Sequence, residues 1–180
     1  MGLSQPVYGT VSSEEDKFAI LDRAYELGAR HWDSSEYIST RKQSPFLSLT
    51  QNHSLYNDNE ETLGKWFKRT NNRSSVFLAT KFGFVKNKFP LLNSTGDYAI
   101  QACEESLRSL GVDYIDLYYL HHPNPNTPIE DTMRGMKQLQ DQGKIKYIGL
   151  SSVSSKTLLR ASKIATISAC LLYTSDAADE

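Results

Sequence analysis

Residues 111–123 read GVDYIDLYYLHHP, and this stretch decides the fold. Gly111 ends a helical pattern, and the apolar run that follows shows no polar face before it reaches His121 and His122. A short apolar run of this kind is typical of a strand that is covered on both faces, as in a parallel sheet. In α/β barrels the titratable residues at strand exits carry the chemistry. The two histidines are therefore candidate site residues.

The same strand-then-helix unit occurs four times along the chain. Three further apolar runs read ARHW, SSVFLAT and KIKYIGL. The residues that directly follow them are Asp33, Lys81 and Ser151. Helical patterns separate the runs, and the first of them opens with a capping box between Ser12 and Glu15. Repeated βα units at this spacing build either a doubly wound sheet or a (β/α) barrel. Because no G-x-G-x-x-G follows any of these runs, the doubly wound nucleotide-binding domain is disfavoured.

Each candidate residue, taken singly, also has a purely structural explanation. Asp33 is equally well a turn or helix cap, Lys81 a solvated lysine and His121 a hydrogen-bonded buried histidine. Ser151 is explained as a turn residue, and Tyr56, in the loop region after the first run, as a packing residue. Their coincidence at equivalent positions of successive βα units favours a common site, because one barrel rim would collect them.

Composition excludes several functional classes. The 180 residues carry a net charge of −1, with 23% charged and 39% hydrophobic residues, which is typical of a globular domain and gives no reason to expect nucleic acid or an anionic membrane as partner. No apolar stretch approaches the roughly 20 residues that span a bilayer, and no signal peptide is recognisable. Two cysteines make neither a disulfide framework nor a zinc site. We expect a cytoplasmic protein without a metal.

Eight blocks of the sequence resemble the aldo-keto reductases. In order, they read MGLS…YG, HWDSSE, YNDNEETLGKWFKRT, VFLATKFG, ESLRSLGVDYIDLYYLH, TPIEDTM, GKIKYIGLSS and TLLRA. The similarity is greatest to a fungal and plant-like subgroup that begins its first loop with MGLS, and it covers most of residues 1–169.

This resemblance implies a (β/α)8 barrel that binds NADPH across its rim and reduces a small aldehyde or ketone. The family's four catalytic residues correspond to Asp33, Tyr56, Lys81 and His121. Asp33, Ser151 and Ser152 correspond to cofactor-binding positions. Ser151 resembles the residue that holds the nicotinamide carboxamide, and Ser152 stands where many members have Asn.

The chemistry of carbonyl reduction agrees with this set of residues. The alkoxide left by hydride transfer needs a proton, but a tyrosine of pKa near 10 is a weak acid at neutral pH. A lysine ammonium about 4 Å away supplies ~4 kcal/mol at an effective dielectric constant near 20, which corresponds to about three pKa units. Asp33 would hold Lys81 in place, and His121 would hydrogen-bond the substrate oxygen.

One departure from the family lies between the first two units. In relatives the tyrosine follows the aspartate by five residues, whereas Tyr56 is far downstream of Asp33 and yet has the expected sequence NDNEE after it. We interpret residues 37–54 as a retained intron, because their codons permit splice signals whose removal would restore DSSDLYNDNEE in frame. The alternative is a native long loop, which barrel rims tolerate.

A second departure concerns the end of the chain. Residues 170–180, CLLYTSDAADE, resemble no part of the family and match a translated sequencing-library adapter. We therefore predict a partial barrel over residues 1–169, roughly strands 2–5 with their helices, that does not close. A complete barrel takes about 250 residues, so this chain alone is expected to have weak activity or none. A non-catalytic regulatory member of the channel β-subunit type remains an alternative. The carbonyl substrate and the oligomeric state are not specified by the sequence.

Overall fold

The computed structural model describes residues 13–35, 59–85 and 92–172. Five parallel strands form a single sheet in the order of the sequence. The strands are β1 (His31–Asp33), β2 (Phe77–Phe82), β3 (Ile115–Leu120), β4 (Ile145–Ser151) and β5 (Ile167–Leu171). Because all are parallel, their carboxyl ends meet at one edge of the sheet, called the exit edge below, and their amino ends meet at the opposite entry edge.

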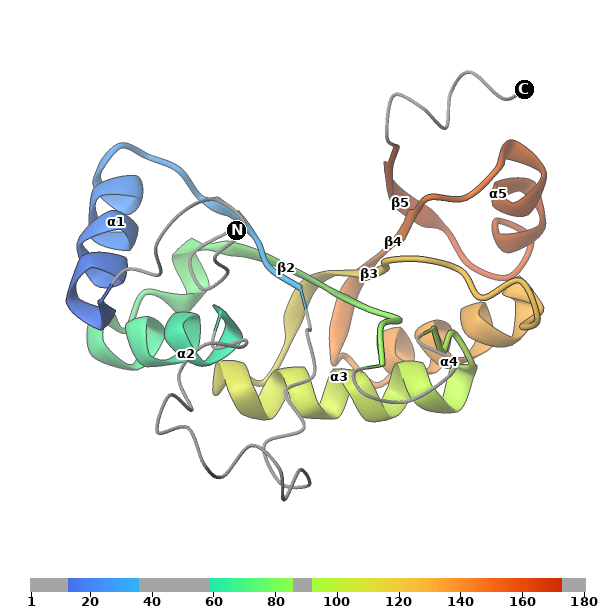
Figure 1. Cartoon of the computed structure of the whole chain (residues 1–180), viewed down its shortest axis with the longest axis horizontal. Coiled ribbons are helices and arrows are strands. Elements are labelled where there is room, and N and C mark those ends of the chain that lie inside the picture. Colours follow the sequence, from blue (N-terminus) through green and yellow to red (C-terminus); the bar gives the residue numbers. More distant parts are fainter. Residues whose placement is uncertain (1–12, 36–58, 86–91, 173–180) are drawn as a thin grey trace, which may run out of the picture.

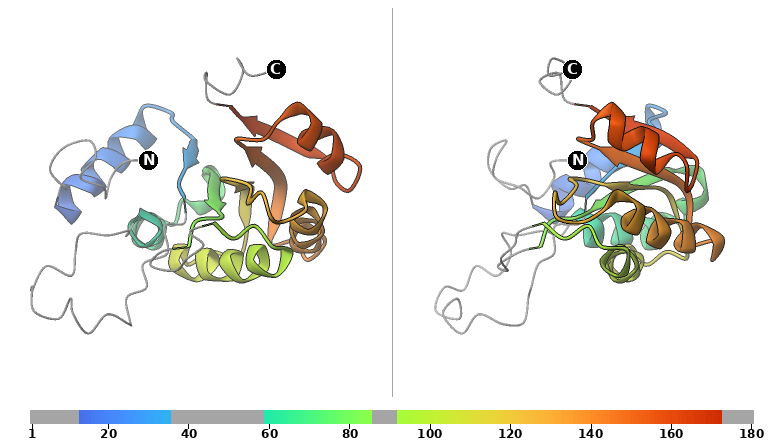
Figure 2. Two further views of the ribbon diagram at one scale, coloured as in Figure 1. Left: turned by 45° about the vertical axis from the view of Figure 1, so that its right-hand side comes forward. Right: turned by 90° about the vertical axis from the view of Figure 1, so that its right-hand side faces the viewer.

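Helices line only one face of this curved sheet (Figure 1). They are α1 (Glu14–Glu26), α2 (Asn59–Thr70), α3 (Gly96–Leu110), α4 (Ile129–Asp141) and α5 (Ser155–Ala161), with a short 3-10 turn η3 (Arg73–Ser75) before β2. Seen from the side, the helices form an arc around the strands, and no helix of the described ranges covers the concave face (Figure 2). The arrangement is an open half-barrel, which confirms the predicted partial (β/α)8 fold.

The main core lies between the sheet and the helices. The predicted apolar face of α3 is buried there, through Ala99, Cys103, Leu107 and Leu110. On the concave face, the period-two alternation of the strands brings a smaller cluster together from Ala79, Leu117 and Tyr119. The ring of Tyr119 covers Gly149 of β4, where a Cβ atom would lie 2.3 Å from the ring. Glycine at this position lets an aromatic side chain cross from β3 onto β4.

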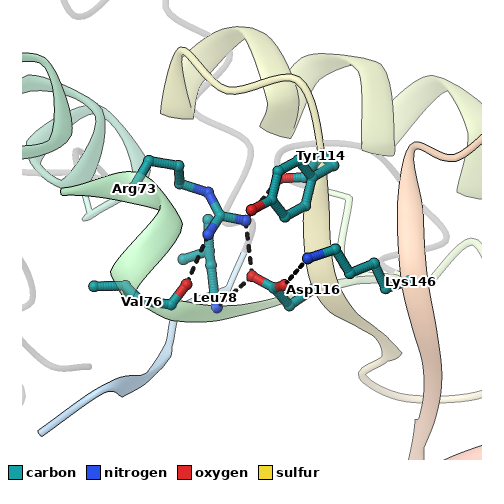
Figure 3. Close-up of polar contacts among 6 residues, drawn as sticks. All are labelled: Arg73, Val76, Leu78, Tyr114, Asp116 and Lys146. Carbon is teal, nitrogen blue, oxygen red and sulfur yellow. Dashed lines mark hydrogen bonds and ion pairs between the residues drawn. The ribbon is translucent and has the colours of Figure 1, made fainter. Parts of the chain in front are cut away.

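A buried charged cluster, called the Asp116 clamp below, joins three strands at the entry edge (Figure 3). Asp116 accepts hydrogen bonds from Arg73 at 2.8 Å, from Lys146 at 2.8 Å and from the backbone N–H of Leu78 at 3.0 Å. The guanidinium and the ammonium also lie 4.3 and 4.0 Å from the ring centroid of Tyr114. Burial acts to raise the pKa of Asp116, but its three donors outweigh burial and hold that pKa below the ordinary value.

The structure differs from the sequence prediction in two details. The first helix is capped one residue later than expected, by a capping box between Ser13 and Asp16. A fifth strand also follows α5, and Cys170 and Leu171, which we assigned to a foreign tail, pair with Leu150 and Ser151. Backbone hydrogen bonds define a strand whatever its side chains are, so the side chains that we set aside as foreign are no obstacle to this pairing.

Candidate active site

Asp33 and Lys81 form an ion pair at the exit edge. The Lys81 ammonium donates to Asp33 Oδ1 at 2.5 Å and to the carbonyl oxygen of Ser34 at 2.8 Å. The side chain of Lys81 is 8% exposed and that of Asp33 is 42% exposed. A buried ammonium is costly unless it is paired. The β1–β2 pairing thus supplies both acceptors that hold Lys81 on the concave side.

His121 follows β3 directly and extends the β2–β3 ladder by one hydrogen bond, from its backbone N–H to the carbonyl oxygen of Phe82 at 2.8 Å. Burial lowers the pKa of its imidazole to about 4, the positive charges of His122 and Lys81 act in the same direction, and Asp33 opposes them. At neutral pH the ring is therefore uncharged, with one N–H to donate. This form can donate a hydrogen bond to an acceptor oxygen without carrying a positive charge.

Two rings accompany the imidazole of His121. The ring of His122 stacks on it at a centroid distance of 5.0 Å and an interplanar angle of 20°. Phe84, from the loop after β2, meets both histidines edge-on, with centroid distances of 5.0 Å in each case. Phe84 thus supplies an apolar contact to both imidazoles.

Ser151 and Ser152 lie where β4 ends. Both hydroxyls are buried, and neither has a hydrogen-bond partner among the described residues. Ser152 adopts a left-handed backbone conformation with φ of 53°, which is uncommon for a residue other than Gly, Asn or Asp. Buried hydroxyls usually find partners in a folded protein, so these two atoms are available to a ligand.

Tyr119 is a site neighbour that the sequence analysis did not single out. Its ring centroid lies 5.7 Å from the Lys81 ammonium. Burial raises the pKa of its phenol, and the negative charges of Asp33 and ionised Cys170 add to this. Such a phenol is a poorer proton donor than an unperturbed one. Period-two alternation from Leu117 was the signal in the sequence that could have placed Tyr119 on the concave face.

The exit edge therefore brings together three of the four predicted catalytic residues, Asp33, Lys81 and His121, and places Ser151 and Ser152 at the end of β4. Tyr56 lies outside the described residues. Across the ranges that the structure describes, no helix is long and apolar enough to cross a membrane.

Comparison with known proteins identifies the class to which this fold and site belong. The model of the aldo/keto reductase family matches residues 1–174. An aldo-keto reductase of Strobilurus tenacellus, str7, is 41% identical over 162 residues, or 90% of this chain. The aldo-keto reductase yakc [NADP(+)] of Schizosaccharomyces pombe is 42% identical over 172 residues, or 94% of this chain. This chain belongs to the aldo/keto reductase family.

Solved structures agree with this assignment. The aldo-keto reductase AKR11C1 from Bacillus halodurans, in its holo form, is 28% identical with a TM-score of 0.68, over 89% of this chain and 49% of that one. The thermostable aldo-keto reductase Tm1743 shares the fold with a TM-score of 0.70, over 94% of this chain and 55% of that one. The chain also spans only 42% and 45% of the two fungal relatives.

Proposed function

We propose that the complete protein reduces a small aldehyde or ketone to an alcohol with NADPH as the hydride donor. The observation that carries this proposal is the pairing of the buried Lys81 with the partly exposed Asp33, beside an imidazole of lowered pKa at one edge of the sheet. The name of the Schizosaccharomyces relative, which includes NADP(+), supports the choice of cofactor.

The residues at the end of β4 fit a nicotinamide. The hydroxyls of Ser151 and Ser152, which have no partner among the described residues, can donate to and accept from a carboxamide. The partly exposed carboxylate of Asp33 lies at the same edge of the sheet, on β1. When bound, NADPH supplies the hydride. The protein's own contribution is to hold this ring and the carbonyl carbon in reach of each other.

The remaining residues act on the substrate oxygen. His121, neutral at pH 7, donates a hydrogen bond that becomes stronger as negative charge develops on that oxygen. Tyr56 delivers the proton, and the Lys81 ammonium, fixed by Asp33, makes the phenol a stronger acid. The raised pKa of Tyr119 makes that phenol unsuited to replace Tyr56.

The test uses the complete spliced coding sequence. We expect NADPH oxidation that depends on a simple aldehyde and that is lost in Tyr56→Phe. A complete, folded protein that binds NADPH without turning over any of a panel of aldehydes and ketones would contradict the proposal and favour the regulatory, channel-associated role. The 180-residue chain alone is expected to show little or no saturable quenching by NADPH and little turnover.

We further infer that residues 37–54 are a retained intron and that residues 170–180 derive from a sequencing adapter. Amplification of the transcript across the first segment is expected to give a form shorter by 54 bases, from the 18 codons of 37–54. Finding only the long form would contradict the intron inference.

A genomic read that continues through the codons of residues 170–180 unchanged would contradict the adapter inference. A cytoplasmic location, with which the free thiol of Cys103 agrees, belongs to the same proposal.

A further inference from the structure

We propose that Phe84 is a positioning residue of this site, which fixes the imidazole of His121 and shields it from water. The inference rests on the proposed function, in which His121 acts as a neutral hydrogen-bond donor, and it adds a residue that neither the motif nor the catalytic set contains.

The ring geometry is the first support. Phe84 contacts the ring of His121 at a centroid distance of 5.0 Å and an interplanar angle of 86°, and that of His122 at 5.0 Å and 76°. Edge-on contacts at this distance are among the favoured aromatic arrangements. One side chain thereby packs against both members of the stacked histidine pair.

The backbone of Phe84 is held in place, which is the second support. Its carbonyl oxygen accepts a hydrogen bond from the Tyr98 hydroxyl at 3.3 Å, and an antiparallel bridge joins it to Leu92. The preceding Gly83 has φ of 127°, and a Cβ atom there would lie 3.3 Å from the carbonyl oxygen of His122. Glycine thus permits the turn that brings Phe84 over the histidines.

The loop that carries the histidines is tied to the same segment. Asn124 donates from its side chain to the carbonyl oxygen of Leu92 at 2.8 Å and from its backbone N–H to Ser94 Oγ at 3.0 Å. The loops after β2 and β3 therefore share one hydrogen-bonded frame, which sets the distance between Phe84 and His121.

Charged groups reach His121 from three elements. His122 lies on its own loop, Lys81 comes from β2 and Asp33 from β1. Removing the ring of Phe84 leaves all three charges in place and admits water to the imidazole. Because hydration favours the charged form, the imidazole should become easier to protonate.

The test is an NMR titration of the chain labelled with 13C at its four histidines. Phe84→Ala is expected to raise the pKa of His121 from about 4 toward the ordinary 6.5, by roughly one pH unit or more. Phe84→Tyr, which keeps the ring, should retain the low value. An unchanged titration in Phe84→Ala, or a raised one in Phe84→Tyr, would overturn the proposal.

The chain offers a matched control in Phe77, which meets His31 edge-on at 5.1 Å at the opposite end of β2. Phe77→Ala should leave the pKa of His121 unchanged. If Phe77→Ala raised that pKa as much as Phe84→Ala does, the rise would reflect a general loosening of the fold, and the proposal would be overturned. If Phe84→Ala does not fold, the unsubstituted chain provides the test. Nuclear Overhauser contacts from the Phe84 ring to both imidazoles are expected, and their absence would overturn the proposal. None of these measurements involves NADPH or turnover, so their outcome is independent of the proposed activity.

Discussion

The two edges of the sheet each hold an ion pair with a buried member, Asp116 at one edge and Lys81 at the other, and the surroundings of the two pairs differ. At the entry edge, Asp116 is saturated by Arg73, Lys146 and a backbone N–H. At the exit edge, the Lys81–Asp33 pair stands beside hydroxyls without described partners and an imidazole of lowered pKa.

This difference separates a structural charge cluster from a functional one. Asp116 meets its donors within the protein and holds a specific geometry, although Arg73 Nε beside it is buried without a described partner. At the exit edge, two neighbouring hydroxyls without described partners and an imidazole of lowered pKa mark a place where a ligand can complete the network. In parallel barrels the exit edge carries the chemistry and the entry edge carries stability. Substitutions at Lys81, Asp116, Glu60 and Ser152, each followed by its measurement and taken in order of expected effect, test or sharpen this comparison.

The largest effect is expected when Lys81 and Lys146 are each replaced by methionine in separate variants. If the proposed function holds, Lys81→Met in the complete protein should lower kcat/KM by about 10²–10⁴-fold, because the proposed proton donor loses the charge that assists it. Lys146→Met should leave kcat/KM unchanged and cost less than about 1 kcal/mol of stability, since its side chain is 48% exposed. Steady-state kinetics and urea denaturation measure the two quantities. Equal losses of activity in both variants would remove the distinction between the edges.

The second effect concerns stability at the entry edge. Asp116→Asn should lower the free energy of unfolding by about 3 kcal/mol, because Arg73 then lies largely buried without its carboxylate. A carboxyl of depressed pKa stabilises the fold above its ordinary pKa, and this contribution is lost as pH falls through the folded-state value. The difference between the variant and the parent should therefore be full at pH 6 and shrink below about pH 4.

A matched control for this substitution is Glu14→Gln. Glu14 pairs with Lys65 on the surface, where the two side chains are 52% and 55% exposed. Its loss should change stability by less than about 1 kcal/mol at any pH. If chemical denaturation gave the same loss for Glu14→Gln as for Asp116→Asn, the clamp would have no special role.

A third carboxyl, Glu60, lies between the two edges on the helix side of the sheet. It accepts a hydrogen bond from Thr80 at 2.7 Å, and burial raises its pKa. A carboxyl of raised pKa stabilises the fold at low pH, and this contribution is lost as pH rises through the folded-state value. Glu60→Gln keeps the acceptor without the charge, so it should raise Tm by roughly a few degrees at pH 8 and by nothing at pH 3. A lower Tm at pH 8 would refute this assignment of the burial effect.

The smallest effect is expected at Ser152. Asn tolerates the left-handed conformation better than Ser, so Ser152→Asn should stabilise the chain by about 0.5–1 kcal/mol. Thermal unfolding measures this change, and Ser154→Asn, at a helix N-cap of ordinary φ, serves as the control in which little change is expected. A destabilised Ser152→Asn would indicate that the hydroxyl itself matters for the fold.

Local patterns in the sequence predicted the strands that form the exit edge, because a parallel strand is recognisable from its own apolar run. They also predicted which residues lie at or near the carboxyl end of each strand, and thereby the approach of Lys81 to Asp33. The Asp116 clamp was not predictable in this way. Its partners are 43 and 30 residues away along the chain, and they meet only once the strand register is known.

Phe84 escaped prediction for a related reason. Its contact with His121 depends on a left-handed glycine and on hydrogen bonds between two loops. The strand β5 was missed because we set aside its last residues, Cys170 and Leu171, for their unfamiliar sequence.

The spatial order of the strands repeats their order along the chain. Every new strand docks onto one that has already been made, so the half-barrel can assemble vectorially during translation, with each βα unit extending a template left by its predecessor. Among the five strands that the structure describes, each pairs with the next one along the chain, so the entropy of closing long loops between them stays small. The half-barrel can therefore form one βα unit at a time as the chain leaves the ribosome.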